Sequence, residues 1–249
     1  MLEKLHDALW ITDGEIVSFY GFLFPTRSVV ARLENGDLWV WSPVKLIPAL
    51  RAELDRLGPV RHLVSPNKMH HLYLQDWHAA YCQALLWGPQ STIRKRRDLK
   101  FCQALQDSAP SEWQPDIDQA WFRGSITMDE IVFLHRPSRT VIVADLIAAF
   151  SDHFLREHWS WWRRQVAVIN GMTANNPHAP LALDWRLSFI NRDRAPARTA
   201  RAKMLSWPCE RVIMAHGECR LSDGHAFLAR SLEWLGPRTD SIDESPNGL

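Results

Sequence analysis

The sequence lacks the features that define several classes of protein. It has no run of about 18 apolar residues, the length that a membrane-spanning helix needs, because its longest apolar stretch, 140–150, contains Asp145. No G-x-G-x-x-G or P-loop pattern is present, and no G-x-S-x-G surrounds Ser65. These absences argue against a membrane span, against nucleotide binding through a glycine-rich loop and against a serine nucleophile elbow.

Cysteine spacing and the N-terminus point to the same compartment. The four cysteines have no C-x-x-C spacing, which disfavours a zinc knuckle and predicts ordinary reduced thiols: Cys82, Cys102, Cys209 and Cys219. The first ten residues carry charged side chains where a signal peptide would be apolar. We therefore expect a cytoplasmic protein.

An excess of charge of one sign is also missing. The 249 residues include 29 basic and 28 acidic side chains, a formal net charge of +1. Such a chain has no overall field that would recruit nucleic acid or an acidic partner. We expect no nucleic-acid partner, and any function must lie in a local site that takes a small molecule.

Hydrophobic side chains are plentiful enough for a large core. They make up 46% of the chain, which includes 13 tryptophans and 11 histidines. The length suits one domain of this size. We predict a single domain over 1–235, with a Trp- and Arg-rich helical insertion at about 147–200 and a disordered tail at 236–249.

Alternating and helical patterns predict the order of elements. The first 45 residues read as an antiparallel meander, including a strand over 15–24. A helix over 43–57 and a strand over 60–64 follow. Further on, a hairpin over 130–144 turns at 135–139, which predicts that His135 is exposed, and helices are expected over 150–162 and 199–207.

Three places put side chains that can bind metal directly after a short apolar strand. His70 and His71 follow the strand over 60–64, Asp145 follows 140–144, and His216 follows 211–215. Ligands gather beyond the carboxyl ends of strands, where loops leave an open crevice. Imidazoles with a carboxylate suit zinc or iron. The sequence therefore predicts that these side chains converge.

This order of elements and motifs resembles the metallo-β-lactamase superfamily and, within it, the family of unknown function numbered 4336. The most specific segments are EIVFLHRPSRTVIVAD, residues 130–145, and RVIMAHG, residues 211–217. The resemblance covers about 9–146 and 199–235. It implies an α/β fold, a four-layer αββα sandwich of two mixed β-sheets flanked by helices.

The signature motif of that superfamily, Thr-His-x-His-x-Asp-His, is degenerate in this chain. The aligned segment has Ser65 for the threonine, Pro66 and Lys68 for the first two histidines, and His70 for the aspartate. Of the last two residues of the motif, an aspartate and a histidine, only the histidine is present, as His71. The third motif, expected within 118–125, also lacks its histidine.

The resemblance therefore implies that the first metal site is lost and that the second is kept by His70, His71, Asp145 and His216. We expect one zinc or iron ion and a metal-bound water that attacks an ester, lactone or amide. Lys68 would lie near Asp145 at the place of the first metal and stabilise the oxyanion.

Another interpretation stays open. In it, the histidines order loops through backbone hydrogen bonds while Asp145 pairs with a basic residue, so that no metal binds. The protein would then be a non-catalytic binding module that retains the fold, since one fold serves many functions.

The Trp-rich segment 154–164 has two interpretations of its own. Its apolar side chains fit a helix over the core, which would place Trp159 and Trp162 in a substrate-binding lid. Trp and Arg together also suit a membrane surface.

Overall fold

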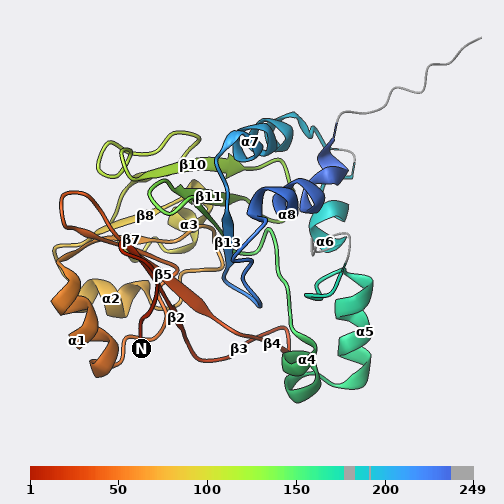
Figure 1. Cartoon of the computed structure of the whole chain (residues 1–249), viewed down its shortest axis with the longest axis horizontal. Helices are drawn as coiled ribbons and strands as arrows, with labels where there is room; N and C mark the ends of the chain where they lie inside the picture. Colours follow the sequence, from red (N-terminus) through yellow and green to blue (C-terminus); the bar gives the residue numbers. More distant parts are fainter. Residues whose placement is uncertain (177–182, 191, 237–249) are drawn as a thin grey trace, which may run out of the picture.

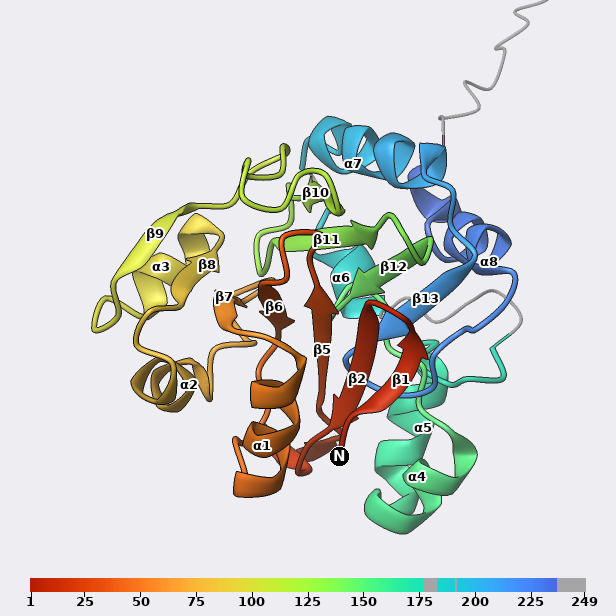
Figure 2. The same ribbon diagram turned by 60° about the vertical axis from the view of Figure 1, so that its left-hand side comes forward.

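Two β-sheets face each other and bury a shared core between them (Figure 1). The computed structural model describes residues 1–176, 183–190 and 192–236. Most of the expected tail, from residue 237 on, and the parts 177–182 and 191 of the expected insertion lie outside the described residues. Helices cover the outer face of each sheet (Figure 2). The predicted αββα sandwich is confirmed.

The first sheet has seven strands in the order β1-β2-β5-β6-β7-β8-β9. Their bounds are β1 Glu3–His6, β2 Leu9–Asp13, β5 Arg27–Arg32, β6 Leu38–Trp41, β7 Val60–Val64, β8 Leu85–Gly88 and β9 Phe101–Ala104. Pairing is antiparallel from β1 to β6 and parallel from β6 to β9. The sheet is therefore mixed, and its parallel part follows the predicted strand–helix–strand unit.

The second sheet has four strands in the order β10-β11-β12-β13. Their bounds are β10 Ile117–Phe122, β11 Glu130–His135, β12 Thr140–Val143 and β13 Arg211–Met214. The predicted hairpin joins β11 to β12, and β12 pairs in parallel with β13. Because β12 and β13 run in the same direction, the residues that follow them emerge at the same edge of the sheet.

Alternating side chains explain why both faces of each sheet are apolar. In β5, Val29 and Ala31 enter the core between the sheets, whereas Val30 packs under the outer helices. In β12, Ile142 faces the other sheet and Val143 faces the helices on its own side. Successive side chains on a strand point to opposite faces, so a run of apolar residues is needed where both faces are covered.

The outer face of the first sheet is covered by three helices, α1 Pro48–Leu57, α2 Leu74–Ala80 and α3 Gln90–Lys95. Helix α1 begins at Pro48, as the fixed φ of proline in a first turn favours, and buries Leu50 and Leu54, which lie one turn apart. The outer face of the second sheet is covered by α6 Leu183–Leu187, α7 Ala195–Ser206, α8 Gly224–Ser231 and the 3-10 turn Glu233–Leu235. No helix within the described ranges is long and apolar enough to cross a bilayer.

A smaller unit lies beside the sandwich and corrects two predictions. The expected strand over 15–24 is a separate hairpin, β3 Val17–Phe19 and β4 Phe22–Phe24, because its two-residue turn reverses the chain at Tyr20. The expected helix over 150–162 is divided into α4 Asp152–His158 and α5 Trp161–Ile169. Trp159 ends α4 in an extended conformation, and its ring packs on the hairpin.

His135 is buried, so its predicted exposure is wrong. The side chain lies at the end of β11, where Nδ1 pairs with the Ser138 hydroxyl at 2.7 Å, and Nε2 has no hydrogen-bond partner among the described residues. Burial, and then the charge of His6, lower the pKa of His135 from 6.5 to about 4. His135 is therefore buried because it belongs to strand β11 and not to the turn that follows.

We predict that His135 makes the protein less stable in acid. Because its folded pKa is lower than its unfolded pKa, the unfolded chain takes up the proton first as the pH falls from about 6.5 to about 4. The free energy of unfolding should fall by on the order of 3 kcal/mol over this range. Urea titrations at several pH values should give a shallower dependence for His135→Gln, and an unchanged one for the exposed control His153→Gln.

Candidate metal centre

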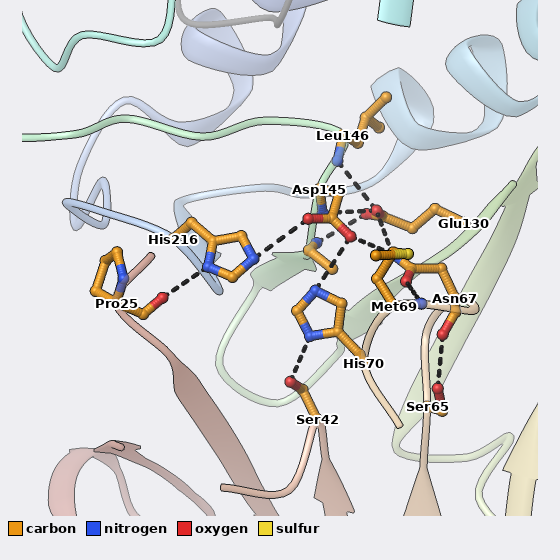
Figure 3. Close-up of polar contacts among 11 residues, drawn as sticks. Pro25, Ser42, Ser65, Asn67, Met69, His70, Glu130, Asp145, Leu146 and His216 are labelled. Atoms are coloured by element: carbon orange, nitrogen blue, oxygen red, sulfur yellow. Dashed lines mark hydrogen bonds and ion pairs between the residues drawn. The ribbon is translucent and has the colours of Figure 1, made fainter. Parts of the chain in front are cut away.

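The carboxylate of Asp145 lies between two imidazoles (Figure 3). Its Oδ2 atom is 3.2 Å from Nε2 of His70, and its Oδ1 atom is 3.2 Å from Nε2 of His216. Ligand atoms of these three residues lie within 4.8 Å of one another. The structure thus brings together one side chain from each of the three predicted places.

Strand topology explains this convergence. Asp145 and His216 follow β12 and β13, which are parallel neighbours with Val143 opposite Met214. His70 lies in the turn after β7, which belongs to the other sheet. The centre therefore bridges the two sheets at the carboxyl ends of three strands, where ligands of sheet proteins gather.

The residue after His216 is held by a close backbone contact. Gly217 has a φ of 101°, and a Cβ atom there would overlap the carbonyl oxygen of Ala149. Both neighbours of Gly217 are hydrogen-bonded to Ala149. The N–H of Ala149 donates to the His216 carbonyl oxygen at 3.1 Å, and the Ala149 carbonyl oxygen accepts the N–H of Glu218 at 2.8 Å. Glycine is needed here for both conformation and space.

Each imidazole is oriented by its other nitrogen. Nδ1 of His216 donates to the carbonyl oxygen of Pro25 at 2.7 Å, so in the neutral ring the lone pair lies on Nε2, the atom that faces Asp145. Nδ1 of His70 pairs with the Ser42 hydroxyl at 2.7 Å, and the ring stacks on Trp41. Histidines that bind metals have such partners on the second nitrogen, because the partner fixes the tautomer and the ring orientation.

Two buried polar side chains form hydrogen bonds with Asp145, one with its carboxylate and one with its backbone. The carboxylate of Glu130 accepts the backbone N–H groups of Ala144, Asp145 and Leu146 at 2.7–3.0 Å. The side-chain amide of Asn67 donates to Asp145 at 2.8 Å and to Glu130 at 3.2 Å. Together they hold the turn that carries Asp145 and leave its oxygens facing the imidazoles.

Burial and neighbouring charges set the protonation of these groups. Burial would raise the pKa of Asp145, but the nearby imidazoles hold it well below 3.8. Burial alone would lower the pKa of His216, whereas its hydrogen bond to Asp145 and the charge of that carboxylate raise it. Burial and then the charge of Asp145 raise the pKa of Glu130 to about 8. The Asp145 carboxylate is therefore ionised, and its negative charge raises the pKa of both His216 and Glu130.

The donor set fits a divalent transition metal. Two imidazole nitrogens and one carboxylate oxygen are common ligands of zinc in catalytic sites and of non-haem iron in sites with open positions. The Asp145 side chain is about 20% exposed, so solvent reaches the centre. His70, Asp145 and His216 would hold the ion.

His71 is not brought to this centre, although we expected it as a ligand. Its ring lies beside Arg96, which approaches Nδ1 at 3.4 Å and donates to the His71 carbonyl oxygen at 2.9 Å. Burial, followed by the charges of Lys95 and Arg96, lowers the pKa of His71 to about 4. Consecutive residues in this turn point in different directions, so only His70 faces Asp145.

Lys68 lies in the same turn as His70. It forms no ion pair or hydrogen bond with Asp145 in the part of the chain that the structure describes. Burial, and then the charge of Lys68, lower the pKa of Lys95. The side chain of this turn that contacts Asp145 is Asn67.

The two tryptophans expected to bind substrate differ from each other. Trp159 is buried, donates its indole N–H to the Leu23 carbonyl oxygen at 2.8 Å, and contacts Phe24, whose ring lies 5.3 Å from that of His216. Trp162 is exposed and contacts Phe22. Trp159 thus belongs to a group of aromatic rings beside His216, together with Phe22 and Phe24. Trp162 contacts this group through Phe22 and is itself exposed.

Sequence reasoning missed four supporting groups, those of Pro25, Ser42, Asn67 and Glu130. Glu130 carried the only available signal, a charged residue at the start of a strand of otherwise buried side chains. Pro25 acts through its backbone carbonyl, and Ser42 is distant in sequence from His70, so neither could be found from spacing.

Comparisons with known proteins agree with this architecture. A family profile described as "Domain of unknown function (DUF4336)" matches residues 6–156, more than half of the chain. The chain belongs to the DUF4336 family. No curated protein matches it.

Solved metallo-β-lactamases share the fold of this DUF4336 protein at low sequence identity. The DIM-1 enzyme exposed to ceftazidime is 13% identical with a TM-score of 0.62, and the enzyme from Erythrobacter litoralis with β-mercaptoethanol in its active site is 12% identical with the same TM-score; each match covers 94% of this chain and 95% of the other. The FIM-1 enzyme from Pseudomonas aeruginosa in its mono-zinc form is 11% identical, with 94% of both chains covered and a TM-score of 0.58. The expected superfamily resemblance is confirmed for the fold.

We predict that Gly217→Ala destabilises the protein far more than Gly36→Ala. Both glycines have positive φ, but nothing lies within 4 Å of a Cβ at Gly36, whereas one at Gly217 meets the Ala149 backbone. Positive φ alone should cost about 1 kcal/mol, and the overlap should bring the cost at Gly217 to about 3 kcal/mol or more. Urea unfolding measures both; equal losses would contradict the proposed close contact.

Proposed function

We propose that this DUF4336 protein binds one divalent metal ion at His70, Asp145 and His216 and is a metal-dependent hydrolase. The observation that carries the proposal is the pair of Nε2 atoms facing the two oxygens of one carboxylate, each at 3.2 Å, with both opposite ring nitrogens held by other groups. Zinc or iron suits this donor set.

The proposed substrate class is a small molecule with an ester, lactone or amide bond. A bound ion of this kind would supply Lewis acidity and a water molecule of lowered pKa. The chain's own residues would bind and orient: Ser42 and Pro25 fix the imidazoles, while Asn67 and Glu130 fix Asp145. The metallo-β-lactamases of similar fold, including one in a mono-zinc form, support this class of chemistry as a hypothesis.

The competing function is a metal-free binding module. One observation favours it: Asp145 already has two histidines and Asn67 as partners, and the charge of Asp145 raises the pKa of His216, so a protonated ion pair can satisfy the site without an ion. Metal content distinguishes the two functions directly.

We predict about one metal ion per chain after reconstitution with zinc and removal of excess metal. His70→Ala and His216→Ala should lose it, because each removes a ligand nitrogen, whereas His71→Ala should retain it, because that ring lies beside Arg96. Elemental analysis by mass spectrometry measures the content, and circular dichroism checks that each variant folds.

The same samples allow a second measurement. An ion that binds only the folded protein raises its free energy of unfolding, by about 2.7 kcal/mol at a hundredfold excess over Kd, so zinc should raise the Tm of the wild type and of His71→Ala only. Wild-type protein without metal after reconstitution with zinc, iron and manganese would favour the binding module. Loss of metal in His71→Ala would contradict the assigned ligands.

Lys68 is proposed to stabilise the oxyanion that develops during hydrolysis. Loss of such a charge typically lowers kcat by about 100-fold or more. We predict this loss for Lys68→Met on an ester or lactone that the wild type hydrolyses, with metal content unchanged because Lys68 is not among the three ligands. An unaltered kcat would exclude Lys68 from the reaction.

A further inference from the structure

One surface of the molecule exposes large apolar side chains together. It consists of the tip of the β3–β4 hairpin and one side of α5, and we call it the aromatic face: Phe19, Tyr20, Trp161, Trp162, Val168 and Ile169. Tyr20 is 87% exposed, Trp161 71% and Ile169 70%. Single exposed apolar side chains are ordinary, but a contiguous group marks an interaction surface.

Helix α5 has its apolar side turned outward. At 100° per residue, Trp161, Trp162, Val168 and Ile169 occupy an arc of about 120°, and all four are exposed. Its only fully buried residue is Ala167. A helix that simply covers a core would show the opposite arrangement, so the outward side of α5 is available for a partner.

The hairpin tip lies against the same helix. The ring of Phe22 is 6.1 Å from that of Trp162, and the Nη2 atom of Arg163 would lie 3.2 Å from a Cβ on Gly21. Figure 1 shows β4 beside α4, the helix that precedes α5. Tyr20 and Gly21 both have positive φ, which is uncommon for a tyrosine. The turn therefore presents the exposed Tyr20 ring next to the exposed side of α5.

Positive charges without acidic partners accompany the aromatic face. Arg156, Arg163 and Arg164 form no ion pair with any residue in the described ranges, and Arg163 stacks over the rings of Phe22 and Trp162. The acidic residues of α4 already have partners: Asp152 accepts from Asn175, and Glu157 lies 3.7 Å from His153 and His158. Helix α5 itself contains no acidic residue.

We propose that the aromatic face binds the surface of a lipid bilayer that contains anionic lipids. Tryptophan and tyrosine rings favour the interface between lipid and water, since one part of each ring is apolar and the other is polar. Unpaired arginines are attracted to anionic headgroups. The aromatic face consists of six residues, fewer than the roughly 20–30 residues a side of a stable protein interface, whereas a few aromatic and apolar side chains are enough for shallow insertion into a bilayer.

This surface lies close to the candidate metal centre. Phe22 contacts both Trp162 and Trp159, and Phe24 contacts both Trp159 and His216. A chain of four aromatic rings thus connects the aromatic face with one ligand of the centre. The proposal of lipid binding nevertheless stands without a bound metal, because none of the residues of the aromatic face is a ligand.

Co-sedimentation with vesicles tests the proposal. We use phosphatidylcholine vesicles with and without phosphatidylglycerol and expect binding that is stronger with phosphatidylglycerol and weakened by salt. The double variant Trp161→Ser and Ile169→Ser should bind at least about ten-fold more weakly, because two side chains lose apolar burial. Arg164→Gln should reduce only the preference for anionic vesicles.

The matched control is Leu221→Ser, a similar change at a residue that is 57% exposed and lies outside the aromatic face. It should bind vesicles as the wild type does. Absence of wild-type binding to both vesicle types would overturn the proposal, and so would equal binding to both. Sedimentation equilibrium that shows a wild-type dimer, dissociated by the double variant, would assign the face to a second copy instead.

Discussion

The carboxylate of Asp145 is the group that side chains from both sheets contact, so its position depends on the packing of both. Its two oxygens face imidazoles supplied by two different sheets, so the distance between these atoms depends on how the sheets pack. The buried Glu130 maintains the turn that carries Asp145 by accepting three consecutive backbone N–H groups. A buried carboxyl group is costly unless it is hydrogen-bonded, and here the three backbone N–H groups and the amide of Asn67 offset that cost.

Apolar packing places these polar groups. Alternate side chains of β12 and β13 enter the core between the sheets, and the remaining ones enter the core under α7 and α8. A strand held on both faces cannot shift its register by one residue without reversing every side chain. Asp145 and His216 therefore emerge from fixed neighbouring strands, and Gly217 permits the close backbone contact that keeps His216 in place.

The successes and failures of prediction have a common physical origin. Periodicity identified the hairpin of β11 and β12 and the strand before His216, because both depend on local patterns of burial. His135 was misplaced because turn residues were expected to be exposed, whereas it lies at the end of a strand under cover from His6. His71 was misassigned because the direction of a side chain within the turn depends on neighbours such as Arg96, which come from elsewhere in the chain.

Patterns within single segments are enough to predict the order of elements, the superfamily resemblance and the three places from which the candidate ligand side chains come. These follow from hydrophobic patterns and short motifs, which are local. The folded chain was needed to show that His70 rather than His71 faces Asp145, that Asn67 rather than Lys68 contacts it, and that α5 turns its tryptophans outward. Each of these depends on contacts between segments distant in the chain, and no spacing within one segment encodes such contacts.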